Sequence, residues 1–449
     1  MDNTVKNQGA LSFGVSKTII WIALITILYL ARDILAIGFP QSIFTLICLI
    51  AFLTVSIEEG LCIFVFSMAL TLPGNEIRLA YFVIFLIKQK HIVRRLKSFN
   101  AFILLILINE LIISYFYFSG SKFQFLYNFL IYALYLLIPI LWSQYKFDRE
   151  AIISSIKCFV VGIILASIIT LYMAVRSRGW GVVLSGSYSL GKVASEYVTG
   201  STMVTSNNRN GLAVQASIAI SLILLLLAQK KAQLLPSSVA SALLLMVVLL
   251  TRSRTGVIMI AMIIIFWVLT ISSKRGHFLS GLFIAGGFVL LIIGLYRLFP
   301  SAWNGVYARF INQTDITNGR NELSILYLGK WKDNILSVLF GYGKNTYFDV
   351  LGIDGVPHNM IVDVLTCSGL IGLLSLLAWL FLYLKSNLKD VEKEQVFYAL
   401  LTPIMYFFST MAGQYFSVAL THLVFSFLLL SSAAMGNDRT EQTSVSGGV

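Results

Sequence analysis

The chain has 449 residues, of which 58% are hydrophobic and only 12% are charged. A soluble domain carries about a quarter charged residues, so this composition excludes an ordinary soluble protein. Many apolar runs reach the length that crosses a bilayer, and uninterrupted stretches such as 222–228 argue against the alternating strands of a β-barrel. The net charge of +13 does not indicate nucleic acid here, because short inner loops of membrane proteins collect Lys and Arg. We therefore expect an all-α polytopic membrane protein.

Hydropathy predicts about 12 to 14 membrane-spanning helices, the first of which is retained because no cleavage site follows Lys17. In chain order the apolar runs are 18–37, 42–56, 61–73, 77–89, 101–118, 123–143, 151–175, 211–228, 235–251, 255–272, 278–298, 358–384 and two further spans before residue 436. The runs between 42 and 89 are short and leave the number of helices there open. We find no internal repeat of the kind that transporters often contain.

The basic cluster 88–97 is expected in the cytoplasm, and alternation from this point places every lysine-rich turn on the same side. Both termini then lie in the cytoplasm. The predicted regions are N-terminal transmembrane helices (1–175), an outer loop (176–210), transmembrane helices (211–298), a large outer loop (299–357), C-terminal transmembrane helices (358–435) and a cytoplasmic tail (436–449).

The outer segments contain basic residues where the topology rule expects few, and most of them are arginines. They are Arg176, Arg178, Arg209, Arg252, Arg254, Arg309 and Arg320. A guanidinium presents a planar fork of donors that suits phosphate oxygens. We therefore predict an outward-facing site for an anionic group such as a lipid-linked phosphate or pyrophosphate. Pairing of these arginines with loop carboxylates or lipid headgroups is the alternative.

His358 is the one histidine of four that begins a membrane helix after a large outer loop. Histidine titrates near neutrality and can accept a proton from a sugar hydroxyl. The positive end of the helix dipole would favour its neutral, basic form. Asn359 and Asp363 share one helix face, and an ionisable residue inside a span suggests function. A capping or headgroup role for His358, and a salt bridge to an arginine for Asp363, are the alternatives.

Two further features leave their roles open. Glu110, next to Asn109, lies in the middle of a span and either lines a cavity or bonds a neighbouring helix. The sequence Gly341-Tyr342-Gly343-Lys344 lacks the glycine spacing of a nucleotide-binding loop, so we interpret it as a turn in the outer loop. The four cysteines show no CxxC spacing, so neither a disulfide framework nor a zinc site is indicated.

An ordered set of short motifs covers about 206–375. His358-Asn359, nine residues and then Gly369-Leu370-Ile371-Gly372 resemble the H-N-x9-G-x-x-G signature of bacterial O-antigen ligases and related O-antigen or capsule polymerases. Similar elements of that family are found upstream, at Asn208-Arg209-Asn210-Gly211, at Ser253-Arg254-Thr255-Gly256, and in Gly319-Arg320, Trp331 and Phe340-Gly341-Tyr342-Gly343. Each motif alone is weak, and their order makes the set more specific.

The resemblance implies a metal-independent, GT-C-like membrane glycosyltransferase that needs no cofactor. Its donor would be a glycan on undecaprenyl pyrophosphate, and its acceptor a glycan or a second lipid-linked unit. His358 would be the base, with Asn359 orienting the acceptor or capping the helix. Arg254, Arg209, Arg320 and Arg252 would hold the pyrophosphate, a use of fixed cations that stabilises a leaving group.

Within this family the histidine signature is more typical of ligases, which transfer the glycan to a lipid A core sugar. We nevertheless favour a polymerase, because polymerases are more varied in sequence and more numerous. A chain-length regulator as a further partner stays open. A flippase for lipid-linked oligosaccharides is the alternative from another class. A flippase would place its cations in a central cavity between related halves, whereas here the arginines gather outside.

Overall fold

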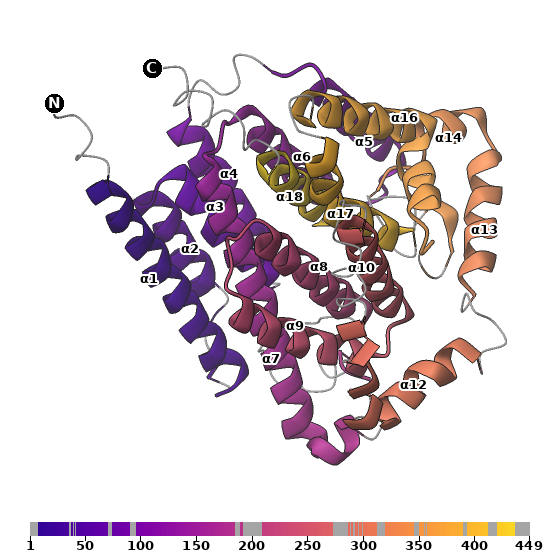
Figure 1. The fold of residues 1–449 in the computed structure, drawn as a ribbon. Coiled ribbons are helices and arrows are strands. Elements are labelled where there is room, and N and C mark those ends of the chain that lie inside the picture. The colour runs from indigo at the N-terminus through magenta and orange to yellow at the C-terminus, as the bar shows by residue number, and fades with distance from the viewer. Residues whose placement is uncertain are drawn as a thin grey trace. The chain divides into compact units, whose positions relative to one another are not determined.

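The structure is a computed structural model, and every regular element in the described part of the chain is an α-helix (Figure 1). The described residues are 8–35, 37–38, 40, 42–70, 74–89, 96–184, 189–191, 209–272, most of 286–311, 319–344, 350–353, 355, 357–388, 393–411 and 420–435. Over these ranges the predicted all-α fold is confirmed.

The chain divides into two compact units, each made of two stretches of sequence. The first comprises Met1–Ile84 and Glu150–Thr314, and the second comprises Phe85–Arg149 and Asp315–Val449. The helix α4 (Asn75–Lys88) runs across the division between the two units at Ile84 and Phe85.

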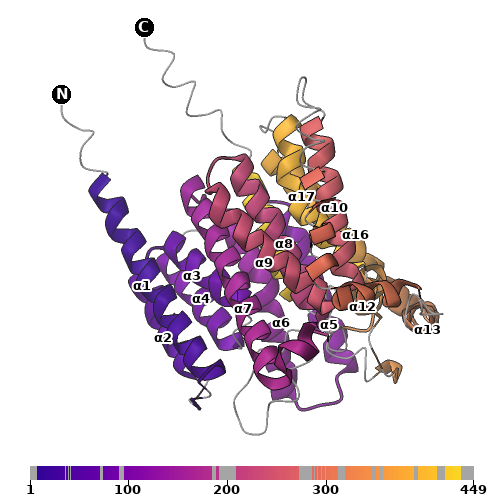
Figure 2. The same ribbon diagram turned by 60° about the horizontal axis from the view of Figure 1, so that its bottom comes forward.

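The first unit contains two groups of helices. The group α1 (Gln8–Asp33), α2 (Ser42–Thr54) and α3 (Ile57–Ala69) packs together, as does the group α8 (Arg209–Ala228), α9 (Leu234–Thr251), α10 (Arg254–Ser272) and α12 (Pro300–Ile311) (Figures 1 and 2). The long α7 (Arg149–Leu184) approaches α3 closely. A Cβ atom on Gly162 would lie 2.7 Å from Ala69 Cβ, so only glycine permits this crossing.

Contacts at the helix ends of the first unit agree with the predicted up-and-down order. Lys231, after α8, pairs with Glu150 at the start of α7 (2.6 Å), and both were predicted inside. At the opposite helix ends, Arg176 of α7 donates to the carbonyl of Ile34 (2.8 Å), and Ser189 donates to the carbonyl of Thr251 (2.7 Å). These four residues were predicted outside. Which end faces the cytoplasm stays a prediction.

The second unit surrounds a core of aromatic and branched side chains. Its helices are α5 (Asn100–Tyr117), α6 (Lys122–Gln144), α13 (Arg320–Lys332), α14 (Ile335–Phe340), α16 (Met360–Leu388), α17 (Lys393–Thr410) and α18 (Leu420–Met435). The helices α5 and α16 pack in opposite directions. The rings of Phe99 and Tyr383 meet at one end of the pair (5.5 Å), and Asn109 reaches the backbone of Ser368 in the middle (3.3 Å).

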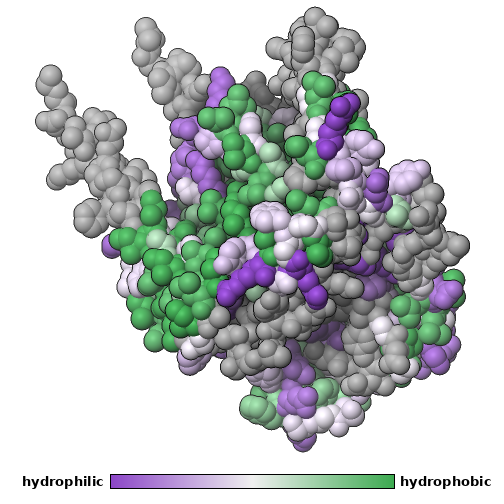
Figure 3. Space-filling model, turned by 90° about the horizontal axis from the view of Figure 1, so that it is seen from below, coloured by the Kyte–Doolittle hydropathy of each residue, from purple (hydrophilic) through white to green (hydrophobic). Residues whose placement is uncertain are grey.

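The chain is a multi-pass membrane protein. Among the described helices, six are long and apolar enough to cross a membrane, namely α5, α6, α7, α8, α9 and α16, and four shorter stretches are also apolar. Apolar side chains gather on the surface over α1 and α2, where Ile20 is 63% exposed and Leu46 is 54% exposed (Figure 3). Such a surface is stable in hydrocarbon and unfavourable in water. The number of 12 to 14 spans stays a prediction.

Three predicted boundaries were wrong. The helix α7 extends to Leu184, well into the predicted outer loop 176–210, with a non-helical residue at Gly179. The predicted loop 299–357 contains α12, α13 and α14. The apolar run 358–384 is not one continuous helix, because Gly369 breaks α16 with a φ of 65° and a ψ of −166°. Much of 278–298 and the tail 436–449 lie outside the described residues.

Candidate functional site

Asn359 caps the helix that follows it. Its Oδ1 accepts hydrogen bonds from the backbone N–H groups of Ile361 (3.0 Å) and Val362 (3.3 Å), which would otherwise lack partners in the first turn of α16. Its carbonyl accepts from the N–H of Asp363 (2.9 Å). Of the two roles expected for Asn359, the structure displays the cap, and a role toward an acceptor stays a prediction.

His358 is partly buried immediately before this cap, and Arg320 is the charged group that acts on it. Burial and the positive charge of Arg320 both disfavour the imidazolium, so they lower the pKa of His358 below its ordinary value. At neutral pH the imidazole is therefore neutral and can accept a proton. The sequence alone attributed this effect to the helix dipole, and the structure supplies burial and the charge of Arg320 as two further causes.

The helix α13 is fastened to the segment that leads into His358. The hydroxyl of Tyr327 donates to the carbonyl of Gly355 (2.7 Å), and Leu323 lies beside Gly355, 3.4 Å from where a Cβ atom would be. Burial raises the pKa of Tyr327 to about 12, so it stays a hydrogen-bond donor at physiological pH. Arg320 begins α13 after Gly319, whose φ of 74° suits glycine. These contacts hold Arg320 and His358 in one substructure.

Asp363 is fully buried in the first turn of α16. Its Oδ1 accepts a weak hydrogen bond from the thiol of Cys367 (3.9 Å). The carboxylate therefore belongs to the interior of the second unit, one turn below the histidine, and the supporting role predicted for it stays a prediction.

Glu110 and the turn 341–344 meet in the interior of the second unit. The carboxylate of Glu110 accepts from the backbone N–H of Lys344 (2.7 Å) and from the hydroxyl of Ser114 (2.5 Å). The N–H groups of Tyr342 and Gly343 donate to the carbonyls of Thr366 and Cys367 (2.8 and 2.9 Å). The turn therefore lies against the middle of α5 and α16, a position that its interpretation as a turn in the outer loop did not include.

The backbone at the break in α16 packs closely against the turn 341–344 and the end of α14. A Cβ on Gly369 would lie 2.3 Å from the carbonyl oxygen of Leu339, and one on Gly341 would lie 2.5 Å from the backbone of Cys367. Asn109 donates to the carbonyl of Phe340 (2.9 Å) and, as noted above, to that of Ser368. Non-helical backbone is tolerated at membrane depth where protein satisfies its polar groups, as here. Glu110, an ionisable residue in the middle of α5, was the sequence signal for the contact between α5 and the turn 341–344. Its partner, the backbone N–H of Lys344, was not predictable.

The first unit holds the other three predicted ligands of the anion. Arg209 begins α8 and Arg254 begins α10, and the two starts are joined because the hydroxyl of Ser253 donates to Asn210 Oδ1 (2.9 Å). The positive charges of Arg209 and Arg254 act on each other. Within the described residues, Nη1 of Arg254 is buried and has no hydrogen-bond partner. Two helix N-termini and two guanidinium groups together form a strongly electropositive environment.

Arg252 differs from its two neighbours. It ends α9 in a left-handed conformation with a φ of 51°, which is uncommon for a residue with a side chain. Its side chain packs against Gly305 of α12, where an added Cβ would lie 2.8 Å from Arg252 Cδ and Nε. Burial lowers the pKa of Arg252. Its contact with α12 gives Arg252 a packing role in addition to the predicted binding role.

The seven predicted site residues thus form two groups. His358, Asn359, Asp363 and Arg320 belong to the second unit, and Arg209, Arg252 and Arg254 belong to the first. Arg309 is described only in its backbone, and Asn208, His91 and His277 lie outside the described residues. Within the described ranges, no group of three or more His, Cys, Asp or Glu side chains could hold a metal ion.

The described part of the chain defines an all-helical, multi-pass membrane protein with a partly buried histidine and arginines in each of its two units. The chain matches no family model, no curated protein and no solved structure.

Proposed function

We propose that this protein is a membrane glycosyltransferase that polymerises lipid-linked oligosaccharide repeat units. The donor would be an oligosaccharide on undecaprenyl pyrophosphate, and the product would be O-antigen, capsule or exopolysaccharide. The reaction would take place on the outer face of a bacterial cytoplasmic membrane. The assignment rests on the motif resemblance around 206–375 together with the chemistry of the side chains.

The observation that carries the proposal is that His358 is partly buried and lies within the electrostatic influence of Arg320. Burial and the positive charge of Arg320 keep the pKa of the histidine low, so the imidazole is available as a base at neutral pH. The same cation suits a phosphate oxygen of the donor. A general base and a cation for the leaving group are the two requirements of transfer from a glycosyl pyrophosphate.

In the proposed step, His358 removes the proton from a hydroxyl group of the acceptor sugar. The hydroxyl oxygen forms a bond to the anomeric carbon of the donor, and the bond from that carbon to the pyrophosphate oxygen breaks. The electron pair leaves with the lipid pyrophosphate, whose charge Arg320 stabilises. The proton then passes from His358 to water.

The arginines at the starts of α8 and α10 support binding of a phosphate-containing ligand. The buried Nη1 of Arg254 lacks a hydrogen-bond partner within the described residues, and a buried donor without a partner is costly. A bound phosphate oxygen would satisfy it. Helix N-termini favour anions for the same electrostatic reason.

The experiment that tests the function is a surface-glycan gel of a strain that lacks this gene, with wild type beside it. A polymerase predicts loss of the ladder while a single repeat unit stays attached to its anchor. Loss of every repeat, with long polymer on the carrier lipid, would instead identify a ligase. An unchanged ladder would contradict both.

A further inference from the structure

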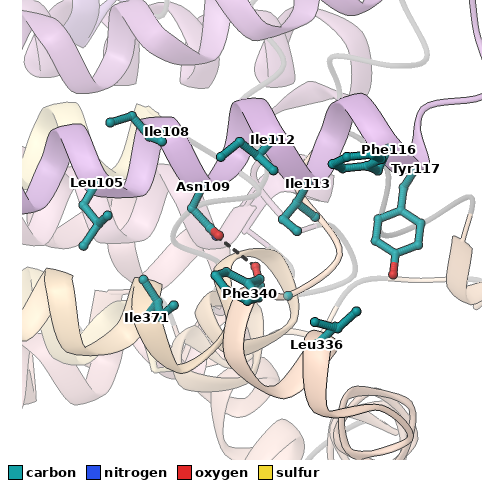
Figure 4. Close-up of a pocket in the computed structure, with 11 residues that line it drawn as sticks. Leu105, Ile108, Asn109, Ile112, Ile113, Phe116, Tyr117, Leu336, Phe340 and Ile371 are labelled. Atoms are coloured by element: carbon teal, nitrogen blue, oxygen red, sulfur yellow. Dashed lines mark hydrogen bonds between the residues drawn. The ribbon is translucent and has the colours of Figure 1, made fainter.

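The second unit contains an apolar groove that the proposed reaction does not use. It has a volume of about 320 Å³ and lies between α5 and α14, with Ile371 of α16 at one side (Figure 4). Ile108, Ile112 and Phe116 line it from α5, and Leu336 and Phe340 line it from α14. Figure 4 shows these side chains along the space between the two helices.

The groove follows a helix that crosses the membrane. The lining residues of α5 run from Leu105 to Tyr117, which is about 18 Å at 1.5 Å per residue. The whole of α5 has 18 residues and rises about 27 Å, close to the thickness of the hydrocarbon core. The groove therefore lies at the depth of the lipid chains, where a ligand made of hydrocarbon is favoured.

Most of the side chains that line the groove are apolar. Asn109 and Tyr117 are the two lining side chains with polar atoms, and both carbonyls that the Asn109 amide contacts belong to the protein backbone. The close fit of Gly341 against Cys367 fixes the wall formed by α14. The groove is thus a preformed apolar surface, the usual character of a ligand pocket.

The groove is open along its length. Phe116 is 75% exposed, and Leu336 and Ile108 are 54% and 53% exposed. A long flexible chain could enter from the side, without passing through the protein. This opening fits a lipid chain better than a compact soluble ligand.

The groove is also continuous with the elements that carry the candidate base. The helix α14 follows α13, which begins with Arg320, and α16, which begins after His358, contributes Ile371. A chain in the groove would therefore be held by the same substructure that holds His358 and Arg320. This continuity favours the lipid part of a substrate over an unrelated membrane lipid.

We propose that this groove binds the polyisoprenoid chain of the lipid-linked donor, an inference that rests on the proposed glycosyltransferase function. The chain would lie along α5 and α14 and position the pyrophosphate at its polar end. Affinity for the donor would then depend on the length of its isoprenoid chain.

The test compares two tryptophan substitutions on α5 and two donors. Ile112→Trp places an indole in the groove, whereas Leu111→Trp changes a neighbouring exposed residue that does not line it. Each purified variant is assayed with the full-length undecaprenyl donor and with the same glycan pyrophosphate on a chain of two isoprene units. Ile112→Trp should raise KM for the long donor at least about tenfold, the loss expected from two buried methylene groups. It should leave KM for the short donor unchanged.

Other patterns would overturn the assignment. If Ile112→Trp and Leu111→Trp behave alike with the long donor, the groove does not hold the chain. If Ile112→Trp impairs both donors equally, the effect does not act through the isoprenoid. If the wild-type protein transfers glycan from neither donor, the proposed glycosyltransferase function is contradicted, and this result does not by itself decide whether the groove binds an isoprenoid chain.

Direct labelling then tests the groove without catalysis. A photoreactive polyisoprenyl pyrophosphate without a glycan should label peptides of α5 and α14 in wild type and Leu111→Trp, but much less in Ile112→Trp. Displacement of this label by phospholipid as readily as by undecaprenyl pyrophosphate would mean that the groove holds ordinary acyl chains, which contradicts the proposal.

Discussion

Replacement of Gly369 by alanine should destabilise the second unit strongly. Two costs combine at this residue. Its φ of 65° lies in the left-handed region, where a side chain costs about 1–2 kcal/mol. The new Cβ would also lie 2.3 Å from the carbonyl oxygen of Leu339, and overpacking of this kind costs about 1–3 kcal/mol. The expected loss in the free energy of unfolding is therefore about 2–5 kcal/mol.

The neighbouring backbone cannot relax to remove the clash without breaking other contacts. Phe340, which follows Leu339, accepts from Asn109, and Tyr342 donates to the carbonyl of Thr366 (2.8 Å). Movement of this turn away from Gly369 would therefore lose buried hydrogen bonds, each of which leaves an unsatisfied group that costs about 1–3 kcal/mol. This network is the reason to expect the upper part of the range.

The assay is denaturant unfolding of the purified protein in detergent micelles, followed by circular dichroism. Gly329→Ala on α13 is the matched control, because a Cβ there meets nothing within 4 Å. This control should be neutral or stabilise the helix by roughly 0.5–1 kcal/mol. If Gly369→Ala unfolds at the same denaturant concentration as wild type, the turn is not seated against the break in α16, and the reasoning is refuted.

Three further predictions concern the proposed reaction. His358→Ala should insert normally but lower kcat by about 10²- to 10⁴-fold, the usual contribution of a general base, and normal transfer in membrane vesicles would exclude the mechanism. Arg320→Gln removes the charge that disfavours the imidazolium, so the pKa of His358 should rise and the acidic limb of the kcat/KM profile should move to higher pH. An unmoved limb would show that another group titrates. Arg254→Lys keeps the charge but loses the planar fork, so KM for the donor should rise, and wild-type kinetics would mean that Arg254 contacts only headgroups.

The helices were largely predictable from the sequence because their signal is local. Continuous apolar runs located α5, α6, α8, α9 and α10 to within a few residues. The end of α7 was missed because the polar residues after Arg176 lower the hydropathy, although helical backbone continues to the kink at Gly179 and a further helical segment ends at Leu184. The break at Gly369 was missed because a single glycine in an apolar run does not by itself indicate a change in backbone direction.

The site was predictable as a set of residue types but not as a geometry. The position of His358 at a helix start follows from the sequence, and so does the chemistry of arginine. The effect of Arg320 on His358 and the packing of Arg252 on Gly305 depend on contacts between distant segments. The cap made by Asn359 is local, and it was one of the two roles that the sequence indicated. Glu110 and Lys344 are separated by 234 positions, and no local pattern links them.

The bond between Glu110 and Lys344 has a consequence for biosynthesis. A ribosome adds about 5–20 residues per second, so Glu110 is synthesised roughly 12–47 seconds before Lys344. During that interval the carboxylate of Glu110 must be neutralised by a proton or shielded by another protein, because a bare charge in hydrocarbon is unfavourable. Ser114, one turn away, is already present and can bond it. The nascent α5 is therefore the stage of assembly at which this protein would most depend on an insertion factor.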